Sequence, residues 1–449
     1  MLQRGVRIVK KLHIFTLLSV FLFFGLFSPV NIGQAAESVD VNAEAAILID
    51  AESGKILYEK EADKKLAIAS MTKMMTEYLV LDAIEDKKIK WDQEVKVSDY
   101  AQKVSQNNNL SNVPLLTEVT YTVKELYEAM AIYSANGATI ALAELVSGSE
   151  ADFVKMMNEK AKELGLDDAK FVNTTGLNNK DLLGKHPVGK ATEENMMSAR
   201  STARLAYELL KKHPNVLETA SIPTKEFTKG LEEGKAIKMK NWNWMLKGLV
   251  LEYPGVDGLK TGSTKQAGYS FTGTVEKDGM RFISVIMKTN SDVARFRETA
   301  KLFDWAFSNF SKQVVVPKGY QFKKNTTVPV VKGKEKKVEV EAAEALQMIM
   351  KNNEKDQYEP TFQLDKKKLE NDALVAPLKK GQKVGTVSVK YKGNESDYGY
   401  ITGEKAYSTP LVTKEEVKKA NWFTLGMRST GSFFGNLWDK TTEKVKNLF

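Results

Sequence analysis

The hydrophobic periodicity of this 449-residue chain changes once, near Asn309. Before that point, apolar residues recur at helical spacing over several stretches, with short apolar runs typical of strands between them. After it, the sequence consists of short alternating or β-branched stretches that favour strands. A domain holds about 150 residues on average, so the length also agrees with more than one unit. The sequence therefore predicts a mixed α and β domain followed by a smaller β-rich domain.

The first of these domains is predicted to contain strand hairpins among its helices. Two pairs of apolar runs are each joined by a glycine-containing turn, at Ser53-Gly54 and at Lys277-Asp278-Gly279, which is typical of hairpins. We expect helices over residues 70–84, 123–146, 151–164, 199–211 and 296–307, and strands over 45–50, 56–59, 269–275 and 280–288. Strands of the second domain are expected over 314–316, 328–331, 337–341, 361–364 and 384–391. The fold class is therefore α+β, with an at least partly antiparallel sheet.

The N-terminal segment has the three-part layout of a secretory signal peptide. A basic start is followed by an apolar run over residues 14–27 and then by small residues before the first acidic residue, Glu37. The run is shorter than the roughly 20 residues that a membrane-spanning helix needs. We therefore predict a signal peptide over residues 1–36 and an exported protein. An uncleaved anchor is the alternative reading.

The C-terminal segment, residues 416–449, is predicted to form an amphipathic helix. Its apolar residues fall on one stripe at helical spacing and its charged residues lie mostly opposite; the stripe consists of Phe434, Leu437, Trp438, Val445, Leu448 and Phe449. Aromatic residues favour the membrane interface, and lysines attract anionic lipid. The pattern predicts a peripheral membrane anchor. The alternative is a terminal helix packed on the protein's own core.

Composition excludes several kinds of site. The chain has no cysteine and only three histidines, so thiol chemistry, thiolate metal sites and histidine-rich metal sites have little or no material. The formal charge is +9. Four of these charges lie in residues 1–36 and a net four in residues 418–449, which leaves +1 for the rest. The basic character thus belongs to the two ends, and a nucleic-acid partner is not expected.

The stretch Ser70-Met71-Thr72-Lys73 opens a predicted helix, and its spacing places Ser70 and Lys73 on one face of the first turn. A serine hydroxyl is a weak nucleophile until a neighbouring base takes its proton. With histidine nearly absent, Lys73 is the remaining candidate base, and it must be neutral to act. The helix N-terminus offers free amides to an oxyanion. A lone Ser-x-x-Lys match is more often a solvated helix face.

Two further motifs change that balance. Ser134-Ala135-Asn136 follows a helical stretch, and Lys260-Thr261-Gly262-Ser263-Thr264 precedes a predicted strand. The order Ser-x-x-Lys, Ser-x-Asn, Lys-Thr-Gly is the signature set of the serine penicillin-recognising enzymes. Each triplet is weak separately, but the ordered set is specific.

On these motifs the chain resembles the low-molecular-mass penicillin-binding proteins of the D-alanyl-D-alanine carboxypeptidase type, the DacA-like enzymes. Supporting stretches include AAILIDAESGKILYEK, ASMTKMMTEYLV and VDGLKTGSTKQAGYSFTGT. The resemblance implies a catalytic domain of β-lactamase/transpeptidase-like fold over residues 37–309 and a small β-sandwich domain over 310–415. It also implies that the helix over 416–449 lies on the outer face of the cytoplasmic membrane.

The resemblance also implies roles for individual residues. Ser70 would be the nucleophile and Lys73 its base, Ser134 would relay a proton toward the leaving amine, Asn136 would hold the substrate amide and Lys260 would supply positive charge. The strand edge along which the substrate lies would be formed by Thr261, Gly262, Ser263 and Thr264. Arg295 would bind the terminal carboxylate together with Thr261. The backbone amides of Ser70 and Ser263 would form the oxyanion hole.

Other conspicuous residues are interpreted as structural. The stretch Asn173-Thr174-Thr175-Gly176 matches a family loop near the site, but a turn explains it. His186 and His213 are expected in a loop and at a helix end. Trp242 and Trp244 are expected to serve packing, the alternative being a platform for carbohydrate.

The implied function is removal of the terminal D-alanine from peptidoglycan stem peptides through a serine acyl-enzyme, with β-lactams as covalent inhibitors. No metal or organic cofactor is implied. Three alternatives stay open: a β-lactamase, although the Glu-x-x-Leu-Asn loop of class A enzymes has no match; a transpeptidase of the same superfamily; and a non-catalytic cell-wall binding protein. The preferred stem peptide and the oligomeric state do not follow from the sequence.

Overall fold

The computed structural model describes residues 39–322, 327–393, 398–403, 407–422 and residue 425. The signal peptide and most of the amphipathic helix predicted at the two ends lie outside these residues. Within them, the buried hydrophobic residues form two large clusters. Among the described helices, none combines the length and the apolarity needed to cross a membrane.

The first cluster surrounds a five-stranded antiparallel sheet with the strand order β2-β1-β11-β10-β9. Its strands are β1 (Ala45–Asp50), β2 (Ile56–Lys60), β9 (Val256–Thr264), β10 (Gly268–Lys277) and β11 (Met280–Thr289). Both predicted hairpins are confirmed, because β1 pairs with β2 and β10 pairs with β11. The order leaves β9 at one edge of the sheet, paired only with β10.

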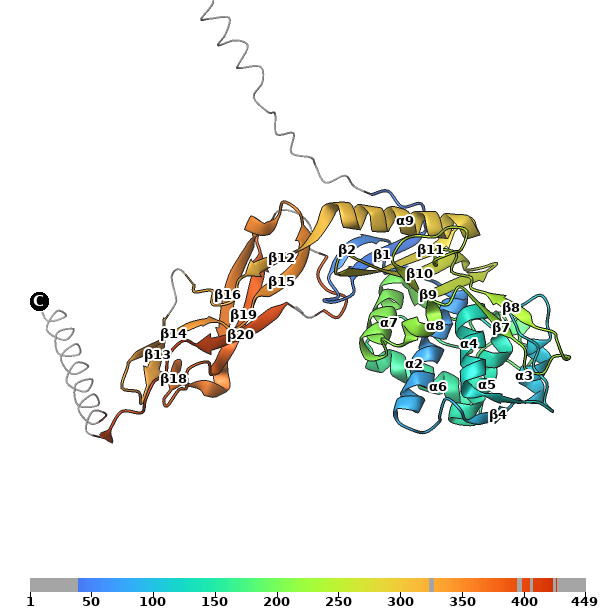
Figure 1. Cartoon of the computed structure of the whole chain (residues 1–449), viewed down its shortest axis with the longest axis horizontal. Coiled ribbons are helices and arrows are strands. Elements are labelled where there is room, and N and C mark those ends of the chain that lie inside the picture. Colours follow the sequence, from blue (N-terminus) through green and yellow to red (C-terminus); the bar gives the residue numbers. More distant parts are fainter. Residues whose placement is uncertain (1–38, 323–326, 394–397, 404–406, 423–424, 426–449) are drawn as a thin grey trace, which may run out of the picture. The chain divides into compact units, whose positions relative to one another are not determined.

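Helices cover both faces of this sheet (Figure 1). α9 (Asp292–Asn309) packs on β10 and β11, while α7 (Ala199–Lys212) packs against β1 and β11. The remaining helices are α2 (Lys73–Glu85), α3 (Asp99–Ser105), α4 (Val123–Tyr133), α5 (Asn136–Ser147), α6 (Glu150–Glu163) and α8 (Val216–Ala220). The predicted combination of an antiparallel sheet with flanking helices is confirmed.

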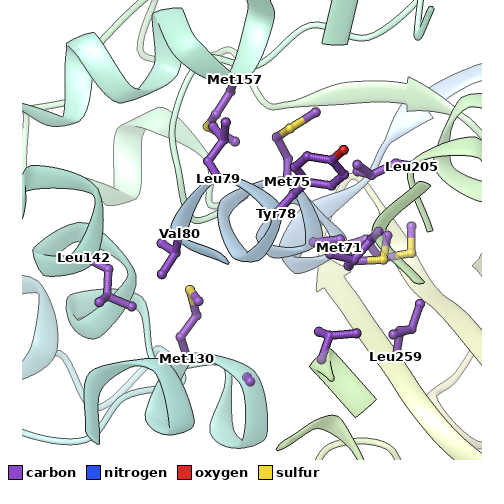
Figure 2. Packing of buried hydrophobic residues seen from close by; sticks show 14 of the residues in the cluster. Met71, Met75, Tyr78, Leu79, Val80, Met130, Leu142, Met157, Leu205 and Leu259 are labelled. Atoms are coloured by element: carbon purple, nitrogen blue, oxygen red, sulfur yellow. The ribbon is translucent and has the colours of Figure 1, made fainter. Parts of the chain in front are cut away.

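α2 lies at the centre of the helical layer, preceded by the short 3-10 helix η1 (Ala69–Thr72). Figure 2 shows apolar side chains from several elements around α2, among them Met130, Leu142 and Met157. Most residues of α2 are buried, and most of these are apolar, as expected of a helix in a core. This burial fixes the position of the residues at its N-terminus.

The helix predicted over residues 123–146 is wrong in one respect, since the structure divides it into α4 and α5. Ser134 ends α4 with φ 60° and ψ 29°, in the left-handed region. Few non-glycine residues adopt this conformation. The apolar period continues on both sides of the break, which is why the pattern reads as one helix.

The second cluster lies between strands of two sheets. A two-stranded sheet pairs β12 (Phe310–Val316) with β15 (Leu346–Lys351). A seven-stranded sheet has the order β16-β19-β20-β14-β13-β18-β17. Its strands are β13 (Thr327–Val331), β14 (Lys337–Ala342), β16 (Tyr358–Leu364), β17 (Leu369–Glu370), β18 (Ala373–Val375), β19 (Lys383–Tyr391) and β20 (Ser408–Thr413). The predicted β-rich character of this region is confirmed.

Candidate active site

Ser70 and Lys73 lie at the junction of η1 and α2. The Lys73 Nζ atom is 3.1 Å from the Ser70 Oγ atom. Ser70 is half-buried, whereas Lys73 has no exposed surface. The predicted spacing of three residues therefore gives a hydroxyl accessible from outside and an amine enclosed behind it.

Two further acceptors surround the Lys73 amine. Nζ donates to the Asn136 Oδ1 atom at 2.9 Å and to the Thr175 carbonyl oxygen at 2.7 Å. A neutral amine has two N–H groups and one lone pair, whereas an ammonium has three donors and no lone pair. If Lys73 is neutral, these two acceptors use both of its hydrogens, and the lone pair is left for the Ser70 hydroxyl.

The environment of Lys73 favours the neutral form. Burial, followed by the positive charge of Lys260, holds the pKa of Lys73 well below its usual value. Desolvation penalises a buried ammonium, and a second cation nearby adds to the penalty. Lys73 is therefore suited to accept a proton near neutral pH.

The break between α4 and α5 supplies the second motif. Asn136 begins α5, and its Nδ2 atom donates to the Ser111 carbonyl at 2.9 Å. This bond turns the amide so that its oxygen faces Lys73. The Ser134 Oγ atom is buried and, within the described residues, has no hydrogen-bond partner. A buried hydroxyl without a partner is available to a bound substrate.

The third motif lies on the edge strand β9, where Lys260 is also buried. Its Nζ atom makes a long contact of 3.4 Å with the Thr261 carbonyl. At Gly262, an added Cβ atom would lie 2.5 Å from the Ile68 carbonyl oxygen and 3.2 Å from the Met71 nitrogen. Glycine is therefore required where β9 passes the segment that carries Ser70.

The remaining predicted residues lie around the same strand. Ser263 is exposed at the end of β9, and the Thr264 hydroxyl donates to Glu194 at 3.1 Å. Arg295 is 2% exposed, contacts the Gly262 carbonyl at 3.4 Å and pairs with Asp292 at 2.7 Å. Burial lowers its pKa to about 10, so Arg295 remains charged at neutral pH. The structure thus brings the predicted substrate-binding residues to one sheet edge.

Comparison with known proteins agrees with this arrangement. A family model described as D-alanyl-D-alanine carboxypeptidase, peptidase S11, matches residues 32–291. The chain belongs to this family of serine peptidases. A second model, the C-terminal domain of penicillin-binding protein 5, matches residues 310–419. The resemblance found in the three motifs is therefore confirmed at the level of the family.

Individual relatives cover most of the chain. D-alanyl-D-alanine carboxypeptidase DacF of Bacillus subtilis is 34% identical over 405 residues, 89% of this chain and 92% of DacF. The corresponding enzyme DacC of Escherichia coli is 32% identical and covers 96% of this chain and 95% of DacC. Among solved structures, PBP3 of Streptococcus pneumoniae, a peptidoglycan synthesis regulatory factor, is 38% identical with a TM-score of 0.71, covering 85% of this chain and 100% of its own.

The loop at residues 173–176 contributes more to the site than the predicted turn. Asn173 does form the turn, since its Oδ1 atom accepts from the Gly176 nitrogen at 2.7 Å. The same loop presents the Thr175 carbonyl to Lys73. Glu150 holds the loop by accepting from the Thr174 hydroxyl at 2.7 Å. An added Cβ at Gly176 would lie 1.9 Å from the Ala69 carbonyl oxygen. The glycine at this position was therefore the sequence signal that this loop lies close to the segment carrying Ser70.

One cluster in the described part of the chain has donors suited to a metal ion, and it lies outside this site. The ligand atoms of Asp82, Glu85 and His213 lie within 4.8 Å of one another. However, Asp82 Oδ1 already contacts Lys212 at 2.6 Å and His213 at 2.7 Å. The Lys212 ammonium thus already supplies the positive charge that a metal ion would bring to Asp82. His213 lies at the end of α7, as predicted.

The two tryptophans also behave as predicted. Trp242 stacks on Tyr133 at 6.1 Å between ring centroids and donates to its carbonyl oxygen at 3.1 Å. Trp244 lies 5.7 Å from Phe296. Both tryptophan rings pack against aromatic neighbours in the structure, which agrees with the predicted packing role.

Proposed function

We propose that this carboxypeptidase removes the terminal D-alanine from peptidoglycan stem peptides through an acyl-enzyme on Ser70. The observation that carries the proposal is the buried Lys73 amine, whose Nζ atom lies 3.1 Å from the Ser70 Oγ atom and donates to Asn136 and Thr175, and whose pKa burial lowers. A base and a nucleophile within hydrogen-bond reach are what acyl transfer requires.

The proposed reaction has two steps. Ser70 attacks the penultimate carbonyl while Lys73 takes its proton, and the amides of Ser70 and Ser263 stabilise the oxyanion. Each such donor stabilises a transition state by about 3 kcal/mol. The Ser134 hydroxyl passes a proton to the leaving amine, Lys260 supplies positive charge, and D-alanine departs. Water then hydrolyses the acyl-enzyme.

The substrate would bind along the free edge of β9, as a further strand beside residues 261–264. The position of β9 at the end of the strand order supports this mode. Arg295, close to the Gly262 carbonyl, would bind the terminal carboxylate with Thr261. A guanidinium suits this role because its planar donors match a carboxylate.

The decisive test is the Ser70→Ala variant. It is expected to abolish both release of D-alanine from a stem peptide and covalent labelling by a fluorescent penicillin. Ser221→Ala, a half-buried serine at the end of α8, is the matched control and should retain both. Labelling of the Ser70→Ala protein would overturn the assignment.

A transpeptidase would form the same acyl-enzyme but transfer it to an amine, and a β-lactamase would release β-lactams quickly. Mass spectrometry of a D-alanyl-D-alanine peptide, with and without an amine acceptor, separates these functions. We expect loss of one alanine with or without the acceptor. A cross-linked dimer would favour transpeptidation, and an unchanged peptide would favour a binding protein.

β-Lactams would act as covalent inhibitors at Ser70. Penicillin-binding protein D2 of Listeria monocytogenes, solved in a cefotaxime-bound form, is 34% identical over 60% of this chain with a TM-score of 0.50. This similarity supports the proposal. A mass increase equal to one β-lactam on the intact protein, absent from Ser70→Ala, is the expected result.

We further propose four segments: a signal peptide at 1–36, a catalytic domain at 37–309, a β-rich domain at 310–415 and a membrane-anchoring helix at 416–449. Export and an amphipathic end would place the enzyme at the outer face of the cytoplasmic membrane. Deleting the residues after Val417 should release it from the membrane fraction of cells. A shortened protein that still sediments with membranes would exclude this anchor.

A further inference from the structure

A buried carboxylate lies behind the two active-site lysines and has no role in the steps above. Glu77 follows Lys73 by four residues on α2, so the two side chains share one face of the helix. It is 4% exposed. Removing a carboxylate from water is costly, so its charge requires an explanation.

The charged groups around Glu77 come from three elements. Lys73 on α2 and Lys260 on β9 interact with it electrostatically, and so does the Tyr127 hydroxyl on α4. In the described part of α5, α6 and α7, which also pack on α2, no charged group contributes to the pKa of Glu77. Burial raises the pKa of Glu77, and the two lysines oppose that shift.

Three positively charged groups, Lys73, Lys260 and Arg295, interact electrostatically here, and few carboxylates oppose them. Lys260 and Arg295 repel each other, as do Lys73 and Lys260. Among the described residues, Glu77 is the one carboxylate whose charge raises the pKa of both lysines. Asp292 pairs with Arg295 at 2.7 Å, and its charge does not contribute to the pKa of either lysine.

We propose that Glu77 is a positioning residue whose negative charge keeps one proton shared by the Lys73–Lys260 pair, so that one lysine is an ammonium while the other is a free base. This inference rests on the proposed function, because it assigns no contact with substrate to Glu77. If both lysines were neutral, the pair would lack a cation. If both were protonated, it would lack a base.

The same charge balances the reaction. When Ser70 attacks, its proton moves to Lys73, and both lysines are then ammonium groups. Their two positive charges are matched by the ionised Glu77 and by the oxyanion of the tetrahedral intermediate. No charge leaves the site in this step, and Glu77 neither gains nor loses a proton.

The test is the dependence of the acylation rate by a fluorescent penicillin on pH in the Glu77→Gln variant. Loss of a negative charge destabilises both ammonium groups, so the acid and alkaline limbs should both move to lower pH, by about one unit or more. At a pH above the alkaline limb the rate should fall about tenfold relative to the unaltered protein. Glu77→Asp keeps the charge and should restore much of the original profile.

Glu144→Gln is the matched control, because Glu144 is a half-buried carboxylate on α5 whose pKa burial also raises. Its profile should equal that of the unaltered protein. A Glu77→Gln profile that is unchanged, or that moves to higher pH, would overturn the inference.

A second measurement does not depend on the variant folding. Burial raises the pKa of Glu77 to about 7, so carbon-13 NMR of the unaltered protein, labelled at glutamate carboxyl carbons, should show Glu77 ionised at the pH where acylation is fastest. A protonated Glu77 at that pH would refute the charge-sharing role. If the unaltered protein accepts penicillin but releases no D-alanine, the proposed function fails while the pH test of Glu77 still stands.

Discussion

At the scale of single residues, burial and the nearby charge of Lys260 favour the neutral form of Lys73, because both hold its pKa well below the usual value. Its amine donates to Asn136 at 2.9 Å and to Thr175 at 2.7 Å, and the Ser70 Oγ atom is slightly farther away, at 3.1 Å. The three partners come from segments far apart in the sequence, and each is held by bonds of its own. The base is thus oriented before any substrate arrives.

Lys73→Met is expected to lower the rate of acylation by a fluorescent penicillin about 10²- to 10⁴-fold, because a positioned general base contributes about that much. Methionine has a similar length and fills the buried site. Thermal unfolding would show whether the variant is folded. A rate within a factor of ten of the unaltered protein would contradict the role of Lys73 as base.

Asn136→Asp is expected to shift the acid limb of the pH–rate profile upward by about one to three units. A carboxylate 2.9 Å from the Lys73 nitrogen stabilises its ammonium form and raises its pKa. The free base then forms only at higher pH, so activity at neutral pH falls and recovers on the alkaline side. An unchanged or downward-shifted limb would contradict this electrostatic account.

At the scale of elements, the site depends on two close approaches. β9 passes the backbone of η1 at Gly262, and the loop at Gly176 touches the Ala69 carbonyl. The segment carrying Ser70 is therefore enclosed between an edge strand and a loop that both need glycine. A side chain at either position would displace Ser70 from the strand edge.

Gly262→Ala is expected to lower the free energy of unfolding by about 1–3 kcal/mol, the usual effect of overpacking, and to slow acylation. Gly279→Asn is the control, since an added Cβ at Gly279 meets nothing within 4 Å and asparagine tolerates its left-handed conformation. Urea unfolding measures the first effect. Equal stability of the two variants would show that the approach of β9 to η1 is looser than described.

Sequence patterns predicted most of these elements because period and turn chemistry are local. The three motifs predicted the family because each is a short local pattern and their order along the chain is specific. Thr175 was not predicted because its carbonyl reaches Lys73 from 102 positions away, and the neighbouring Gly176 indicates a turn or a close approach without saying which backbone group meets the lysine. Glu77 was hidden for another reason, since a glutamate within a helix resembles any solvated residue until burial is known.

At the scale of the whole molecule, charge is distributed unevenly along the chain. The formal charge of +9 falls to +1 once the four charges of residues 1–36 and the net four of residues 418–449 are removed. The region that holds the site is therefore nearly neutral. Attraction to anionic lipid would depend on the C-terminal segment alone in the mature protein.

The full mature chain should bind vesicles containing anionic lipid, and binding should weaken as salt rises from 0.01 M toward 1 M, where the Debye length falls from about 30 to about 3 Å. Vesicles of neutral lipid should bind it less. A chain ending at Val417 should bind neither. Sedimentation with vesicles measures this, and salt-independent binding of the shortened chain would place the membrane contact elsewhere.

The free edge of β9 has a cost for an exported protein. Sheet edges are normally blunted by proline, charge or a covering helix, because an open edge also accepts a strand from another molecule. If the substrate binds there as proposed, this edge cannot be closed in the same way. Changes at the exposed Ser263 or the half-buried Thr264 would then alter self-association and solubility as well as substrate choice.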